Sequence, residues 1–298
     1  MTTALAVFAD GLVYAAWLFI VAVGLTLIFG VMKILNVAHG SFYAFGAYTA
    51  ASAIGFYFDR GLPLAGGYLV MLGSAVAVGL VIGIILERGL LRRFYGRAEI
   101  ISALVTYAVF LILEDVLVLI WGSQGYFAYQ PYTAAGTINL GRLPVSRYDI
   151  ALVAFAALLA AASWYGLRRT AFGRKLITVI FDRELAAAFG VNVSRIYVIT
   201  FVIGSVLGAL GGALTAPKIS VTPGIGVEVI VIAFAVVAIG GMGSIEGALV
   251  GALIVGLCRA AAVHLAPSLD LFVVYAVMAS VLVLRPYGLF TRAQARKI

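Results

Sequence analysis

Long apolar stretches alternate with short polar connections along almost the whole chain. Nine can be delimited, at residues 10–31, 36–58, 63–86, 100–121, 149–167, 195–214, 226–241, 246–265 and 269–285. A helix needs roughly 20 apolar residues to cross a bilayer core about 30 Å thick. The stretches are continuous, without the alternating polarity of barrel strands, and lipid offers the backbone no other hydrogen-bonding partner. The pattern therefore predicts an all-α integral membrane protein, a polytopic bundle of about eight or nine transmembrane helices.

The seventh stretch, at 226–241, is short for a helix that crosses a bilayer unaided. We expect a broken or re-entrant helix at this point. An arrangement of eight spans with one re-entrant segment is the alternative to nine spans.

Composition supports the same fold class. Hydrophobic residues make up 64% of the chain and charged residues 11%, with a mean hydropathy of +1.15. Soluble domains carry about 25% charged residues, because their surfaces face water. Most of this surface must therefore face membrane lipid, which excludes a soluble enzyme.

The basic residues predict an orientation in the membrane. Arg-rich connections face the cytoplasm in most membrane proteins, and most of the 20 Lys and Arg then lie inside. The outside keeps only Arg60, Arg142, Arg147 and Lys218. This places the N-terminus outside and the C-terminus in the cytoplasm of a multi-pass inner (plasma) membrane protein. The net charge of +8 follows this topology, so it does not indicate nucleic-acid binding.

Two connections are long, and neither forms a soluble domain, so residues 1–298 are expected to be one transmembrane domain. The connection at about 122–148 is rich in Gly, Tyr and Pro and lies outside. The connection at about 168–195 is charged and cytoplasmic, and its residues 182–189 favour a short helix that ends at Gly190.

The sequence lacks the common signatures of catalysis and metal binding. It has no GxxxxGK[ST] loop for ATP and no HExxH pair. The single cysteine, Cys258, lies in an apolar stretch and supports neither a disulfide nor a thiolate metal site. We therefore expect no catalytic residue, no metal and no cofactor bound by this chain.

Glycines spaced by four recur in the apolar stretches, at Gly79/Gly83, Gly204/Gly208/Gly212 and Gly243/Gly247/Gly251. Small residues at this spacing let helix backbones approach closely in lipid. The Gly-Ser pairs Gly40-Ser41 and Gly243-Ser244 are further candidates for helix breaks near a pathway. Broken helices in both halves of a chain are typical of transporters built from repeats.

Four short motifs follow one another through nearly the whole chain: Asn36-Val37-Ala38-His39-Gly40-Ser41 continued by Gly46-Ala47-Tyr48, Arg169 to Arg174 followed by Asp182 to Gly190, Gly240 to Ser244, and Arg285 to Phe290. Each motif is weak alone, but four in order are specific. They resemble the permeases of branched-chain amino acid ABC importers, and the N-x-A-H-G form resembles the LivH-like member of the two paralogous permeases.

The resemblance implies a permease that imports branched-chain amino acids or related small solutes. Its implied partners are a LivM-like second permease, ABC ATPase subunits that bind and hydrolyse the ATP, and a periplasmic substrate-binding protein. The implied ATPase-coupling residues are Asp182, Glu184, Ala186, Ala187 and Gly190.

Several polar residues within apolar stretches are candidates for the translocation pathway, because such residues are costly in lipid. Asn36, His39 and Ser41 either line the pathway or form a hydrogen-bonded helix end. Gly243 and Ser244 are candidates through the expected break. A further acidic residue, Glu228, begins a short span, where a helix N-terminus favours negative charge.

Glu114 and Asp115 are adjacent carboxylates within the fourth stretch. They cap a helix break, pair with a basic residue, or reach water near the outer mouth. Proton coupling through this pair defines the alternative function, an ion-coupled secondary transporter of a small carboxylate or amino acid. A secondary transporter has no use for an ATPase-docking helix.

Arg259 lies about thirteen residues into the eighth stretch and departs from the acidic residue common in the resembling family. Such an arginine must face protein, water or an anion. It is expected to pair with Glu114, Asp115 or Asp270, or with the partner permease. The alternative is that it attracts a carboxylate substrate.

Overall fold

The nine predicted apolar stretches are helices in the structure. The computed structural model describes residues 2–140 and 143–290, so Arg142 and residues 291–298 lie outside the described residues. The stretches correspond in chain order to α1 (Thr2–Met32), α2 (His39–Phe58), α3 (Leu64–Gly89), α4 (Glu99–Trp121), α6 (Arg147–Arg169), α9 (Val193–Thr215), α10 (Ile225–Gly240), α11 (Ile245–Leu265) and α12 (Asp270–Leu284). The predicted all-α bundle is confirmed, although α1 begins eight residues earlier than expected.

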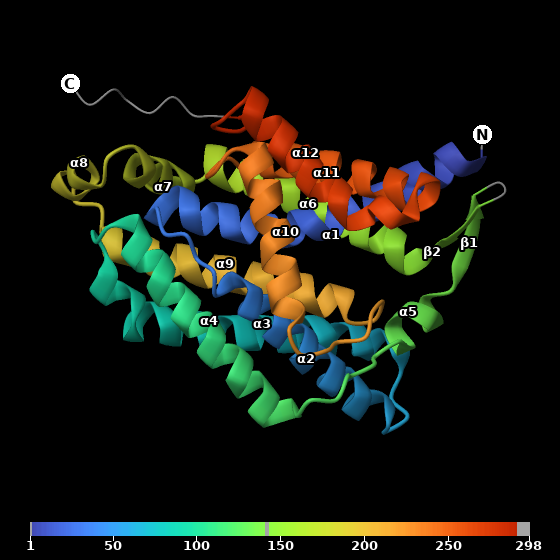
Figure 1. The fold of residues 1–298 in the computed structure, drawn as a ribbon. Coiled ribbons are helices and arrows are strands. Elements are labelled where there is room, and N and C mark those ends of the chain that lie inside the picture. The colour runs from blue at the N-terminus through green and yellow to red at the C-terminus, as the bar shows by residue number, and fades with distance from the viewer. Residues whose placement is uncertain (1, 141–142, 291–298) are drawn as a thin grey trace.

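Short elements occupy the connections: η1 (Leu91–Phe94), α5 (Gln130–Ala135), β1 (Thr137–Leu140), β2 (Leu143–Ser146), α7 (Ala171–Phe181), α8 (Arg183–Ala188) and η2 (Pro267–Leu269). The strands β1 and β2 form an antiparallel hairpin. The hairpin and α5 lie at one end of the bundle, and α7 and α8 lie at the other (Figure 1). We call these the hairpin end and the α8 end.

Six described helices, α1, α3, α4, α6, α9 and α11, are long and apolar enough to cross a membrane alone. Two others begin inside the bundle. His39, the first residue of α2, has its Nε2 atom 3.0 Å from the carbonyl oxygen of Val21, in the interior of α1. The start of α10 touches the start of α2, where a Cβ atom on Gly40 would lie 2.4 Å from the oxygen of Gly226. The irregular segments 33–38 and 216–224 therefore precede two helices that start at the same depth.

The helix contacts indicate a repeat of four helices, which is inverted because α1 ends and α9 begins at the α8 end (Figure 1). α1 packs against α11, and α3 packs in the same way against α9. α2 packs against α9 as α10 packs against α1, and α2 contacts α10 directly. If α1, α2, α3 and α4 are exchanged in order with α9, α10, α11 and α12, the same set of contacts results. α2 and α10 therefore occupy equivalent positions in the two halves.

The predicted break at Gly243-Ser244 is placed differently by the structure. These residues connect α10 to α11 and do not interrupt a helix. Gly241 and Gly243 have φ angles of 101° and 87°, a backbone conformation that glycine adopts without steric cost. The counterpart of the segment 33–38 in the second half lies earlier in the chain, at 216–224, where the chain enters the bundle between α9 and α10.

Close backbone contact through small residues is confirmed at the helix crossings. A Cβ atom on Gly212 of α9 would lie 2.0 Å from the carbonyl oxygen of Tyr43 in α2. A Cβ atom on Gly251 of α11 would lie 2.4 Å from the oxygen of Val236 in α10. Van der Waals packing is a main source of helix association in lipid, so these glycines hold the bundle together.

The outer surface of the bundle is apolar. On α4, Leu104, Ile112 and Leu119 are all well exposed, Leu119 to 83%. Leucine and isoleucine on an outward helix face fit contact with lipid acyl chains, so the exposure agrees with the predicted membrane environment.

Candidate functional site

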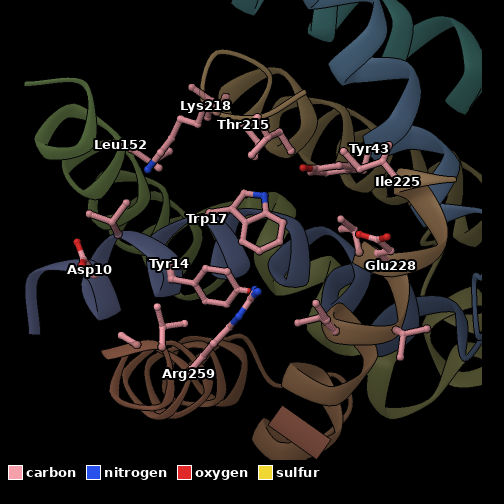
Figure 2. Close-up of a pocket in the computed structure, with 18 of the residues that line it drawn as sticks. Asp10, Tyr14, Trp17, Tyr43, Leu152, Thr215, Lys218, Ile225, Glu228 and Arg259 are labelled. Carbon is pink, nitrogen blue, oxygen red and sulfur yellow. The ribbon is translucent and has the colours of Figure 1, made fainter. Parts of the chain in front are cut away.

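A cavity of about 940 Å³ lies in the hairpin-end half of the bundle (Figure 2). Its walls come from α1, α6, α10 and α11, with the segment 216–224 closing one side. Most of the lining is apolar, including Leu152, Ile225 and Ile232. A cavity of this size with a few placed polar groups is typical of a binding site for a small solute.

Most charged groups of the cavity form ion pairs. Lys218 pairs with Asp149, and Nε2 of His264 lies 2.7 Å from a carboxylate oxygen of Asp10. Each pair joins elements that are distant in sequence, so the charges brace the cavity walls.

Arg259 of α11 is also engaged within the chain. Its Nε and Nη2 atoms donate to the two carboxylate oxygens of Asp270, at 2.6 and 2.9 Å, and Nη1 donates to the Tyr14 hydroxyl. The guanidinium carbon also lies 4.4 Å from the centre of the Tyr14 ring. A bidentate pair of this kind is both strong and geometrically specific. Of the predicted partners, the structure therefore selects Asp270.

Glu228 differs from the other charged groups of the cavity. It lies in the first turn of α10, as the sequence predicts, and its side chain is exposed on the cavity wall. No basic partner for it is found within residues 2–140 and 143–290. The sequence indicated only that Glu228 stabilises a helix N-terminus, whereas the structure also places it in the cavity wall.

Three aromatic residues form a continuous wall beside these charges. Trp17 stands between Tyr14 and Tyr43, with ring centroids 5.0 and 6.1 Å away respectively (Figure 2). The hydroxyl of Tyr43 lies near Trp17 and Thr215. Neither Oη of Tyr43 nor Nε1 of Trp17 reaches a described partner in hydrogen-bonding geometry.

Asn36, His39 and Ser41 lie together at the start of α2 and are fully buried. Nε2 of His39 contacts a carbonyl oxygen of α1, and the Ser41 hydroxyl donates to the oxygen of Phe110 at 3.5 Å. The side chain of Asn36 has no hydrogen bond to the described residues. These residues form a helix junction outside the cavity wall, and their role in translocation stays a prediction.

Glu114 caps the second broken helix. Its Oε2 atom accepts a hydrogen bond of 3.2 Å from the backbone N–H of Gly224, the residue before α10. Of the three predicted roles, the structure shows the cap. Asp115 is exposed on the outer face of α4, so the two carboxylates do not act on one site.

Gly243 and Ser244 also have structural roles. Gly243 lies against Gly30 of α1, where a Cβ atom on Gly30 would be 3.2 Å from its Cα. The Ser244 hydroxyl accepts a 3.0 Å hydrogen bond from the N–H of Gly247 at the start of α11. Serine at this position satisfies a backbone donor that a helix leaves free.

The predicted helix at residues 182–190 is present as α8. The Asp182 carboxylate accepts 2.9 Å hydrogen bonds from the N–H groups of Glu184 and Leu185. Gly190 ends the segment with a φ angle of 78°. The side chains of Glu184, Leu185, Ala187 and Phe189 are exposed, Phe189 to 76%. α8 thus presents an apolar surface with a carboxylate at the α8 end of the bundle.

The inner side of α8 is anchored to the membrane helices. Ala186 is fully buried in a cluster with Tyr197 of α9. Arg183 lies beside Tyr197, whose ring packs edge-on against Tyr95 at 4.9 Å. The Tyr95 hydroxyl donates to the buried carboxylate of Glu87 at the end of α3.

The sequence carries no local signal for this anchor, because a tyrosine eight residues after a glutamate forms no recognisable pattern. Burial, followed by the bond to Glu87, raises the pKa of Tyr95 well above its ordinary value. The hydroxyl therefore remains a proton donor at physiological pH.

A polytopic helix bundle with a mostly apolar cavity in one half and a protruding helix at the opposite end defines a membrane permease. The family described as "Branched-chain amino acid transport system / permease component" matches residues 7–282. The chain therefore belongs to this family of transport-system permeases.

Curated relatives agree over most of the chain. The high-affinity branched-chain amino acid permease LivH of Escherichia coli is 26% identical over 288 residues, which cover 94% of this chain and 92% of LivH. BraD of Pseudomonas aeruginosa is 26% identical and covers 97% of this chain and 96% of its own. The ribose import permease RbsC of Escherichia coli is 28% identical over 80% of this chain and 71% of its own.

Proposed function

We propose that this chain is the LivH-like membrane subunit of an ATP-driven importer in the bacterial inner membrane, moving branched-chain amino acids or related small solutes inward. The observation that carries the proposal is α8, whose outer side is exposed while its inner side is anchored to α3 and α9. A helix of this kind transmits force from a docked motor to the transmembrane helices. ATP binding and hydrolysis belong to partner ATPases.

Orientation follows from charge. Arg88 at the end of α3, Arg92 in η1, Arg169 at the end of α6 and Arg183 in α8 lie near one apolar cluster at the α8 end. At the other end of the bundle, Arg60 follows α2, and Lys218 pairs with Asp149 in the first turn of α6. The positive-inside rule then favours a cytoplasmic α8 end. The cavity faces outward in this arrangement, where a periplasmic binding protein delivers solute.

Movement of the solute requires two states of the bundle. Closure of the ATPases displaces α8, and Ala186 and Tyr197 pass the displacement to α9. α9 packs against α1, α2 and α3, so a tilt of α9 changes the cavity and the broken helices together. A LivM-like second permease completes the pathway.

The ion-coupled alternative is not favoured by any observation. It requires Glu114 and Asp115 to act together, whereas one caps α10 and the other faces outward from α4.

Partner capture tests the proposal. The tagged chain, purified from its native host in mild detergent, is expected to bring P-loop ATPases and a second permease, identified by mass spectrometry. Glu184→Lys or Gly190→Asp should reduce recovery of the ATPases, because each alters the exposed side of α8. The matched control is Asp59→Lys, which introduces the same charge change at an exposed position of the hairpin end. A chain that purifies alone and moves solute in liposomes without ATP would contradict the proposal.

A further inference from the structure

We propose that the cavity recognises the ammonium group of its solute, with Glu228 as the counter-ion and Trp17 and Tyr43 as the adjoining aromatic wall. This inference rests on the proposed function and deepens it. It names the chemical feature that the permease selects, an amine on an apolar body, and the residue that selects it.

Among the carboxylates that line the cavity, that of Glu228 has no hydrogen bond or ion pair to the described residues. Lys218 is neutralised by Asp149 and Arg259 by Asp270, while Asp10 faces His264. Glu228 has no corresponding basic partner in the described part of the chain. The wall therefore carries a net negative charge at Glu228, which attracts a cation and repels a free carboxylate.

The position of Glu228 keeps its carboxylate available. It lies in the first turn of α10, and the partial positive charge of a helix N-terminus stabilises a nearby anion. Its side chain is nevertheless exposed on the cavity wall (Figure 2). The helix supports the charge without covering the oxygens, so they are free to accept hydrogen bonds from an ammonium group.

The aromatic wall adds a second, independent feature. Tyr43 lines the cavity, and its buried hydroxyl lies beside Trp17 and Thr215 without a hydrogen bond of normal geometry to the described residues. Trp17 presents its indole ring at the same wall. Aromatic faces attract cations, and a tyrosine hydroxyl oxygen at the cavity wall can accept a hydrogen bond from an ammonium N–H. The two features converge on one class of ligand.

Arg259 does not provide a binding site for the carboxylate of a solute. Three donors of Arg259 are already directed at Asp270 and Tyr14, and the Tyr14 ring covers its guanidinium. A solute carboxylate gains little there. We therefore expect apolar primary amines to bind, including apolar amino acids through their ammonium group. Sugars and amine-free carboxylates should bind far more weakly.

Saturation-transfer NMR on the full chain in lipid nanodiscs tests this selection. The probes share one branched apolar body: 3-methylbutylamine, L-leucine, 4-methylpentanoate and 3-methylbutan-1-ol. The two amine-bearing probes are expected to bind at least roughly 10-fold more tightly than the acid and the alcohol. This ratio corresponds to a single charge-assisted hydrogen bond.

Variants separate recognition from structure. Glu228→Gln should weaken the amine-bearing probes about 10-fold, and Tyr43→Phe by a few-fold, as loss of a charged and of a neutral partner respectively. Glu246→Gln is the matched control, because Glu246 also occupies the first turn of a helix but lies outside the cavity wall. It should leave binding unchanged.

Three outcomes would overturn the inference: equal binding of the amine and the acid, unchanged binding by Glu228→Gln, or no binding of any probe up to its solubility limit. Partner capture distinguishes this failure from failure of the proposed function. A chain that recovers its ATPases but shows no amine preference remains an importer subunit whose cavity lacks this selectivity.

Discussion

At the scale of single residues, the ionisable groups of this bundle have divided roles. Arg259 and Asp270 pair with each other, Glu114 caps a helix, and Glu228 lines the cavity without an ion pair to any described residue. In lipid a charged group survives only with such a partner or with access to water. The role of each ionisable side chain therefore depends on the residues that the fold places beside it.

The Arg259–Asp270 pair is expected to be structural. About a quarter of each side chain is exposed, so Arg259→Leu should cost about 1–3 kcal/mol, between the values for surface and buried pairs. The double variant with Asp270→Leu should recover part of this loss, because no unpaired charge remains. Thermal unfolding in detergent measures both effects. Unchanged stability together with selective loss of carboxylate binding would instead support a substrate role for Arg259.

At the scale of elements, the crossing of α2 and α10 holds the starts of the two broken helices in close contact. Gly40→Ala would place a methyl group 2.4 Å from the carbonyl oxygen of Gly226, and overpacking of this kind typically costs about 1–3 kcal/mol. We expect a lower melting temperature and reduced transport. Gly55→Ala is the control within the same helix, because its added methyl group meets no atom within 4 Å. Equal effects of both variants would contradict the close contact.

The hydrogen bond between Tyr95 and Glu87, which helps to anchor α8, can be tested by substitution. Tyr95→Phe leaves the buried Glu87 carboxylate without its donor, which should destabilise the α8 end by about 1–3 kcal/mol. Because the pKa of Tyr95 is raised in the folded chain, its contribution is present below the ordinary tyrosine pKa of about 10 and is lost only above it. The difference between variant and wild type should thus be constant from pH 6 to about pH 9.

Hydrogen exchange at α8 and thermal unfolding measure this loss. Tyr107→Phe serves as the control, because Tyr107 is an exposed tyrosine on the outer face of α4. A loss that appears between pH 6 and 9 would contradict a neutral Tyr95 donor.

At the scale of the whole molecule, the two ends of the bundle are chemically distinct. In Figure 1 the first turn of α1 and the hairpin lie at one end, and α7 and α8 lie at the other. The inverted repeat places the starts of α2 and α10 in contact between them. From the end-to-end asymmetry of charge, the positive-inside rule predicts that the α8 end enters the cytoplasm.

Cysteine labelling tests this orientation. In a Cys258→Ser background, a membrane-impermeant thiol reagent should label Arg60→Cys in intact spheroplasts and Arg174→Cys only after permeabilisation. Both positions are exposed and lie at opposite ends of the bundle. The reverse pattern would invert the proposed topology and place α8 outside the cell.

The sequence by itself determined the features that depend on local patterns. Apolar length predicted the helices, and the Asp182 and Gly190 signals predicted α8, because spans and caps are set by residues within a few positions of one another. The charge distribution likewise predicts an orientation, which the labelling experiment tests.

The tertiary structure alone decided the rest. Glu114 reaches Gly224 across 110 positions, and Glu228 becomes a cavity residue only because α1, α6 and α11 enclose the start of α10. Gly243-Ser244 was predicted to interrupt a helix, but it forms the turn between α10 and α11, and the irregular segment that enters the bundle lies at 216–224. Glycine is common both in turns between helices and at breaks within a helix, so the sequence does not distinguish the two. The positions of Glu114 and Glu228 depend on how the broken helices cross. Close backbone contact between distant segments leaves no periodic pattern in the sequence of either segment.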